Sequence, residues 1–181
     1  MPSSIASSAS ARTLWRRFRR NRAGSAAVEF ALVAPVFFAL LFAIIEVALM
    51  FFASQVLETI TQESARQILT GQAQTAGLTQ TQFHDNVVCP QISALFTCAN
   101  VFVDVESYPS FSNISINNQT DCSSTFNNIM HYSPGNPGDI VVVRLFYQWP
   151  LFVTGLGFNM CNMSGNKRLL VATAAFQNEP Y

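Results

Sequence analysis

The sequence predicts an α+β protein in which a long N-terminal transmembrane helix extends outward and leads into a small disulfide-bearing domain with an antiparallel sheet. Three observations support this prediction: an apolar run of 24 residues lies near the N-terminus, segments with strand character gather later in the chain, and all four cysteines follow the apolar run. A helix followed by a group of strands is typical of an α+β arrangement. We expect a leader over residues 1–24 that is cleaved off, the transmembrane and extended helix over 25–71, and an extracytoplasmic α+β domain over 72–181.

The leader is basic. Residues 1–24 contain six arginines and no acid, whereas the rest of the chain contains four basic and ten acidic residues. A basic arm can bind nucleic acid, but arginines beside a long apolar run mark the cytoplasmic flank of a membrane segment. We therefore predict no nucleic-acid partner, a cytoplasmic N-terminus, and residues 54–181 on the other side of the membrane.

The apolar run is Phe30–Ala53, interrupted only by Pro35 and Glu46. A helix of this length measures roughly 36 Å, which exceeds the ~30 Å of a hydrocarbon core. About fifteen Leu, Ile, Val and Phe residues each favour insertion by ~0.3–0.6 kcal/mol, and this outweighs the ~2.5–3.5 kcal/mol cost of one central carboxylate. A buried core helix and a secretory signal are the alternatives, but the run is too uniformly apolar for the first and too long for the second. Pro35 removes one helical hydrogen bond and should kink the helix.

The helix should continue beyond the membrane surface. No Gly or Pro occurs from Ser54 to Thr70, and Gly71 is a suitable C-terminal stop. A narrow apolar face recurs at steps of three and four residues and consists of Leu57, Ile60, Ser64 and Ile68.

The remaining elements follow from local patterns. We predict a polar linker over Gln72–Thr81 and a turn at Pro134–Gly138. A short helix is predicted over Thr81–Val88. The predicted strands are Val101–Val105, Ser112–Ile116, Ile140–Trp149 and Arg168–Phe176.

The four cysteines are Cys89, Cys98, Cys122 and Cys161. An even number in an oxidising compartment predicts two disulfides, for which three connectivities are possible. The pairing Cys89–Cys98 with Cys122–Cys161 is the simplest, because its first bond closes a short local loop. No metal and no cofactor are predicted, since the chain has no CxxC pair and neither His84 nor His131 lies at ligand spacing from the cysteines.

The most informative motif joins the leader to the helix. It reads Arg22-Ala23-Gly24-Ser25-Ala26-Ala27-Val28-Glu29-Phe30. This segment resembles a type IV prepilin cleavage site, at which a prepilin peptidase cuts between Gly24 and Ser25. Glycine has no side chain to obstruct an extended backbone in a protease cleft. The new ammonium at Ser25 would lie one helical turn from Glu29, so the two charges can neutralise each other.

The resemblance extends over residues 16–70. The segment Ala27–Pro35, AVEFALVAP, is similar to the start of the TadE-like pseudopilins of the tight-adherence (Flp) pilus system. The "IIE" of Ile44–Glu46, the segment Gln62–Arg66 and the ending Asn178-Glu179-Pro180 are similar to further family features. Ala34 and Gln62 depart from the usual residues. The resemblance implies that Glu29 and Phe30 belong to the processing and assembly signal.

This resemblance implies a minor pilin or pseudopilin in the bacterial inner membrane, with a periplasmic C-terminal domain. The implied partners are a prepilin peptidase, other pilin subunits, the inner-membrane assembly platform and the bilayer. Two interpretations of Glu46 stay open: a carboxylate hydrated at the outer membrane edge, or one that packs against another subunit. An uncleaved, membrane-anchored binding or adhesin module is the alternative function. No enzyme is predicted, because the chain lacks the GxSxG, P-loop and HExxH motifs.

Overall fold

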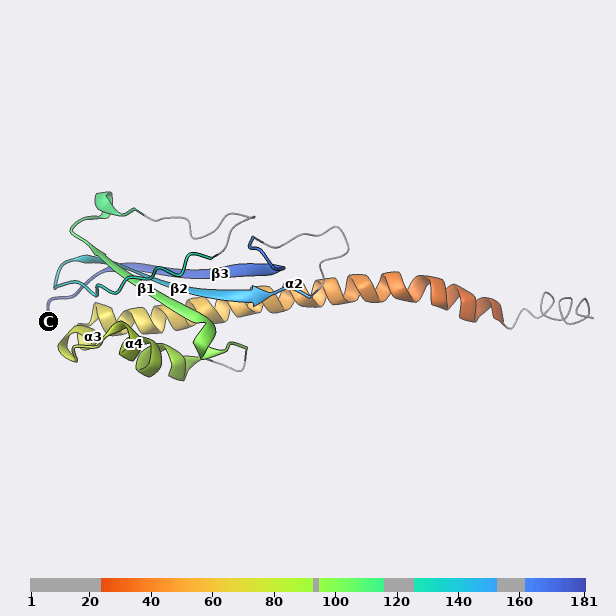
Figure 1. Ribbon diagram of the computed structural model, residues 1–181, viewed down its shortest axis with the longest axis horizontal. Helices are drawn as coiled ribbons and strands as arrows, with labels where there is room; N and C mark the ends of the chain where they lie inside the picture. The colour runs from red at the N-terminus through yellow and green to blue at the C-terminus, as the bar shows by residue number, and fades with distance from the viewer. Residues whose placement is uncertain (1–23, 93–94, 116–125, 153–161) are drawn as a thin grey trace, which may run out of the picture. The chain divides into compact units, whose positions relative to one another are not determined.

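The computed structural model describes residues 24–92, 95–115, 126–152 and 162–181 (Figure 1). The chain divides into two compact units, residues 1–43 and 44–181. The long helix α2, Ser25–Leu69, contributes to both units. The prediction of one helix from the leader junction to the residues before Gly71 is therefore confirmed.

Two features end α2 at Leu69. Gly71 adopts a left-handed conformation, with φ of 71°, which glycine reaches without steric cost. The backbone N–H of Glu179 donates a 3.0 Å hydrogen bond to the carbonyl of Leu69. This bond satisfies one of the carbonyls that a helix end leaves without an intrahelical partner.

In the first unit, the helix exposes large apolar side chains on all of its faces. The exposed residues between 28 and 42 are Val28, Phe30, Leu32, Val33, Val36, Phe37, Phe38, Leu40, Leu41 and Phe42. Exposure of so much apolar surface to water is unfavourable by about 25 cal/mol per Å². Within the described residues, α2 alone is long and apolar enough to cross a membrane, which fits a membrane-anchored protein.

In the second unit, one stripe of α2 is buried in the core. The predicted face of Leu57, Ile60, Ser64 and Ile68 is buried as expected. Met50 and Ala53 extend this stripe toward the N-terminus at the same spacing, and both belong to the same hydrophobic cluster. The helix therefore buries one apolar stripe against the sheet, as the 3.6-residue period requires.

The sheet has three antiparallel strands in the order β1-β2-β3. Their bounds are Val101–Tyr108 for β1, Ile140–Pro150 for β2 and Lys167–Gln177 for β3. The strands predicted at these places are confirmed. The central strand β2 is buried over most of its length, which explains why its sequence is nearly continuously apolar rather than alternating. One sheet face packs on α2, and the other carries a second apolar cluster around Phe126 and Phe146.

Short helical segments connect α2 to β1. They are α3 (Gln72–Thr75), α4 (Gln80–Phe83), the π-helix η2 (His84–Val88), and the 3₁₀ segments η3 (Cys89–Gln91) and η4 (Cys98–Asn100). The predicted helix over Thr81–Val88 is confirmed. The linker predicted over Gln72–Thr81 is wrong at both ends, because α3 follows Gly71 directly and a capping box between Thr79 and Gln82 starts α4.

The strand predicted over Ser112–Ile116 is wrong for Ser112–Ser115, and Ile116 lies outside the described residues. The chain forms the 3₁₀ segment η5, Phe111–Asn113, at this place. The Ser110 and Ser112 hydroxyls hydrogen-bond to each other at 2.9 Å, and Ser112 also donates to the Asn113 side chain. Short polar side chains that bond locally favour turns over an extended strand.

Candidate functional site

The predicted cleavage site lies where α2 begins. Gly24 is exposed and immediately precedes Ser25, the first residue of the helix. A Cβ atom built on Gly24 would meet no other atom within 4 Å. The bond between Gly24 and Ser25 therefore joins the last residue before the helix to its first residue, in open surroundings.

The next predicted residues lie on the exposed part of α2. Glu29 follows Ser25 by one helical turn, and Glu29 and Phe30 are both exposed. Pro35 lies inside the helix, which continues through it. The roles of Glu29 and Phe30 in processing and assembly stay predictions.

Glu46, by contrast, is buried in the second unit with only 7% of its surface exposed. Its carboxylate accepts a hydrogen bond from the backbone N–H of Phe152, 106 residues away in the sequence. Hydrogen bonds to a charged group contribute about 1.5–3 kcal/mol. Glu46 therefore fixes the end of β2 to the helix, a contact that neither interpretation from the sequence contained.

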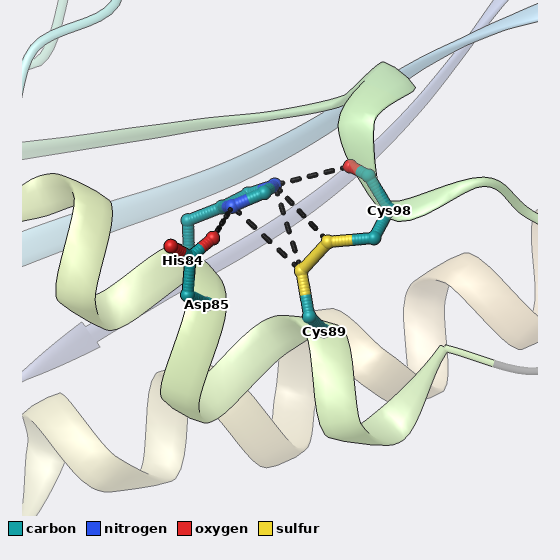
Figure 2. The surroundings of a disulfide bond; sticks show 4 residues. All are labelled: His84, Asp85, Cys89 and Cys98. Atoms are coloured by element: carbon teal, nitrogen blue, oxygen red, sulfur yellow. Dashed lines mark hydrogen bonds and ion pairs between the residues drawn. A yellow bond between two sulfur atoms is a disulfide. The ribbon is translucent and has the colours of Figure 1, made fainter.

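The structure contains the Cys89–Cys98 disulfide (Figure 2). It joins the start of η3 to the start of η4, with the two Cα atoms 5.5 Å apart. This is the short local loop of the simplest predicted pairing. Cys122 and Cys161 lie outside the described residues.

His84 lies against this disulfide. Its Nδ1 atom is 2.7 Å from an Asp85 carboxylate oxygen, its Nε2 atom is 3.1 Å from the Cys98 carbonyl, and the ring nitrogens lie 3.7–3.8 Å from the two sulfurs (Figure 2). This contact was not predicted from the sequence, because a spacing of five residues does not place His84 and Cys89 on one face of an α-helix. The π-helix η2 brings them together, since its i→i+5 hydrogen bonds place residue 89 one turn after residue 84.

We expect alkylation under non-reducing conditions to leave Cys89 and Cys98 unlabelled. Reduction should also raise protease sensitivity near residues 89–98, because the bond closes a loop with a sequence separation of 9. In the chain-entropy account, a loop of this size stabilises by about 2–3 kcal/mol. Mass spectrometry of alkylated peptides provides the measurement, with a Cys89→Ser, Cys98→Ser double variant as the permanently open control. Labelling of both cysteines without reductant would contradict this expectation.

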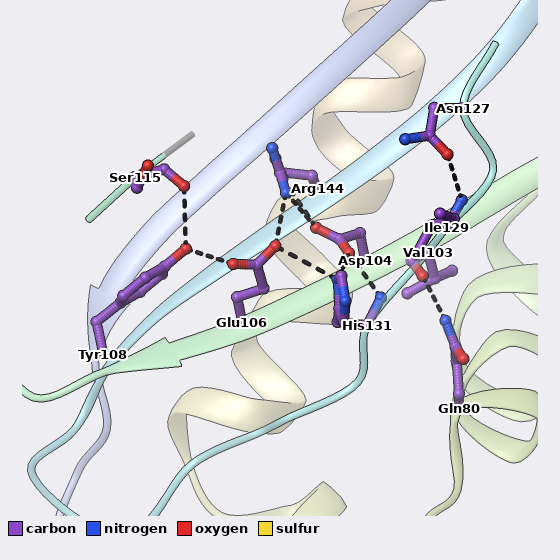
Figure 3. A network of polar contacts seen from close by, with 10 residues as sticks. All are labelled: Gln80, Val103, Asp104, Glu106, Tyr108, Ser115, Asn127, Ile129, His131 and Arg144. Carbon is purple, nitrogen blue, oxygen red and sulfur yellow. Dashed lines mark hydrogen bonds and ion pairs between the residues drawn. The ribbon is translucent and has the colours of Figure 1, made fainter. Parts of the chain in front are cut away.

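A charged network lies on the sheet face opposite α2 (Figure 3). Asp104 on β1 and Arg144 on β2 are direct cross-strand partners, and both are buried. Arg144 donates to Asp104 from Nε at 2.9 Å and from Nη2 at 2.6 Å, and to Glu106 at 2.9 Å. The backbone N–H of His131 donates to the other Asp104 oxygen at 2.8 Å. The buried carboxylate is thus satisfied at both of its oxygens.

Two further side chains extend this network toward solvent. The exposed His131 ring lies 3.6 Å from Asp104 and 3.7 Å from Glu106. The Tyr108 hydroxyl donates to Glu106, and burial followed by the nearby Glu106 carboxylate raises the pKa of Tyr108 above its usual value. Tyr132 is not part of this network and packs against the hydrophobic cluster shared with α2, where burial raises its pKa to about 12. The Arg144 guanidinium lies at the centre of the network, where its Nη2 atom donates to both the Asp104 and the Glu106 carboxylates.

The C-terminal residues hold the far end of the domain together. The buried Asn178 side chain donates to the carbonyls of Pro134 and Asn136, at 2.9 and 3.1 Å. The Tyr181 ring covers Gly71, and Tyr181 donates to the Gly135 carbonyl at 3.4 Å. The ending singled out in the sequence therefore ties the helix end to the predicted turn at residues 134–138.

Comparison with known proteins gives one match, to a family model. No curated protein and no solved structure matches the chain. Residues 24–66 match the family model described as TadE-like protein. This range begins at the predicted cleavage site and ends inside α2, within the residues on which the resemblance depended. The match confirms that the N-terminal segment of this chain is TadE-like and supports a component associated with the Tad pilus.

Proposed function

We propose that this chain is a minor pilin or pseudopilin, a structural or assembly component of a tight-adherence pilus and secretion system. One observation carries the proposal. The TadE-like segment starts at Gly24, and α2 starts one residue later. Cutting after Gly24 would leave a mature protein whose first residue opens a 45-residue helix.

The properties of that helix support a subunit that is first held in a membrane and then assembled. Its N-terminal part exposes apolar side chains, and its C-terminal part is built into a folded domain. We propose a cytoplasmic leader, an inner-membrane anchor and a periplasmic domain, because the arginines lie before the apolar run. The domain then serves as a structural module rather than an enzyme.

The proposed partners follow from the same segment. A prepilin peptidase would cut after Gly24, and other pilin subunits with the inner-membrane platform would receive the mature chain. The new ammonium at Ser25 would lie one turn from Glu29, within the subunit or beside a neighbour. Burying a carboxylate in hydrocarbon is costly, and the Ser25 ammonium would offset part of that cost for Glu29.

Processing tests the proposal directly. In cells with an active prepilin peptidase, the protein should lose residues 1–24, and mass spectrometry should find Ser25 at the N-terminus. Gly24→Ala should slow the loss, and Gly24→Val should abolish it, because side chains at this position obstruct the extended backbone that a protease requires.

Cells with a catalytically inactive peptidase provide the control and should retain the full-size chain. Since a Cβ at position 24 meets no other atom within 4 Å, both variants should fold and insert normally. Full-size wild-type protein in the presence of active peptidase would refute the pseudopilin assignment. The uncleaved, anchored binding module would then be the better description.

A further inference from the structure

The lipid-facing character of α2 does not stop at the boundary of the folded unit. Between residues 44 and 52 the helix still exposes Ile44, Ile45, Leu49, Phe51 and Phe52. Only the narrow stripe through Met50 and Ala53 is covered by the domain. Because these exposed side chains continue the apolar run without a break, the hydrocarbon should reach along α2 as far as Phe52.

The chain just after β2 lies beside the same part of α2, residues 44–52. The Phe152 backbone N–H bonds to Glu46, and Leu151 shares a hydrophobic cluster with Met50 and Ala53. Glu46 precedes Phe52 by six residues, so Phe152 lies roughly 9 Å below the outer end of the exposed apolar surface. With hydrocarbon reaching Phe52, this part of the domain would lie at membrane depth.

The Phe152 side chain points away from the protein. It is 82% exposed, the highest value among the large hydrophobic side chains that the structure describes. The hydrogen bond to Glu46 involves only the Phe152 backbone, and the Phe152 ring is not part of either hydrophobic cluster. A lone exposed Phe is ordinary on a soluble surface, but this one lies beside a band of lipid-facing residues.

The charges of the sheet agree with this placement. Lys167 and Arg168 are two of the four basic residues that follow Gly24, and they pair with Pro150 and Trp149 at the same end of the sheet. The acids Asp139 and Glu179 flank the opposite end. Lys167 is exposed and pairs with a residue two positions before Phe152, roughly 7 Å along the strand. That spacing suits a base among phosphate groups when an aromatic ring lies in hydrocarbon.

We propose that the end of β2 is a second membrane contact, in which Phe152 inserts into the leaflet on the domain's side while Lys167 and Arg168 face lipid phosphates. The domain is then held against the bilayer surface rather than standing away from it on α2. This inference rests on α2 spanning a bilayer and does not depend on a role in the pilus.

The test uses the full chain in vesicles of phosphatidylethanolamine and phosphatidylglycerol. The photoreactive analogue p-benzoylphenylalanine replaces Phe152, and lipid adducts are measured by mass spectrometry after irradiation. The same analogue at Ile129 and at Phe111 provides matched controls, because these side chains are similarly exposed, at 63% and 62%, elsewhere on the domain. Phe51, 64% exposed on α2, is the positive control.

Position 152 should form lipid adducts at a level near that of position 51 and on the order of tenfold above positions 129 and 111, as expected for an aromatic ring that is buried in hydrocarbon. Adducts at 152 no higher than at 129 would overturn the inference, as would adducts chiefly to a second protein chain. Failure at 51 as well would overturn the membrane anchor and this inference together. A Lys167→Gln, Arg168→Gln variant should lower the yield at 152 and leave the yield at 51 unchanged; an unchanged yield at 152 would remove the two bases from the contact.

Discussion

Replacing Arg144 with methionine should lower the free energy of unfolding by about 3–5 kcal/mol, because the change leaves the Asp104 carboxylate buried without its cation. Asp104 has no exposed surface, and Arg144 supplies two of its hydrogen bonds. Methionine is close to arginine in length and apolar, so packing on the sheet is largely kept. Urea unfolding of the chain without residues 1–24 provides the measurement. In that chain, Trp149 is the only tryptophan and reports on the core.

Two further variants separate charge from packing. Glu106→Gln should cost less than about 1 kcal/mol, because the Glu106 side chain is 25% exposed and water can replace its interaction with Arg144. Asp104→Leu combined with Arg144→Met should recover part of the loss, since both buried charges are then removed. The recovery should be incomplete because the His131 N–H loses its acceptor. A cost below 1 kcal/mol for Arg144→Met alone would mean that water reaches Asp104.

The elements that repeat a short period were predictable from the sequence. The uniform apolar run and the Leu57–Ile68 face predicted α2, and Gly71 predicted its end. The strands β1, β2 and β3 appear within a few residues of their predicted bounds. These patterns are local, because a helix or strand buries its own face wherever it packs. The start of α2 beside Gly24 is equally local.

The contacts between distant residues were not predictable in this way. Asp104 and Arg144 are 40 residues apart, and Glu46 and Phe152 are 106 residues apart. Each contact depends on strand register or on how the sheet is seated on α2, and one sequence does not specify either. The contact between His84 and the disulfide was not predicted for a different reason. It arises from a π-helix, and i→i+5 hydrogen bonding is too rare to be expected from a sequence.

Gly71→Ala should lower the free energy of unfolding by about 2–4 kcal/mol, through backbone strain and loss of the C-terminal packing. Gly71 has a φ of 71°, and a Cβ atom at this position would lie 2.2 Å from the Tyr181 ring. Since that distance is far below van der Waals contact, Tyr181 must move away from the helix end. The hydrogen bonds of Glu179 to Leu69 and of Tyr181 to Gly135 lie next to the displaced ring and should weaken.

Gly77→Ala is the matched control because it isolates the strain. Gly77 has a similar φ of 61°, but a Cβ atom there would meet nothing within 4 Å. The Gly77→Ala substitution should lower the free energy of unfolding by about 1 kcal/mol, because the strain of the left-handed backbone is partly offset by the lower entropy of the unfolded chain. The difference between the two variants then measures how strongly the C-terminal residues hold the end of α2. In a chain that already carries Tyr181→Ala, Gly71→Ala should lower the free energy of unfolding only as much as Gly77→Ala does. Equal costs for the two glycine variants in the intact chain would show that the C-terminal ending adds little to the stability of the domain.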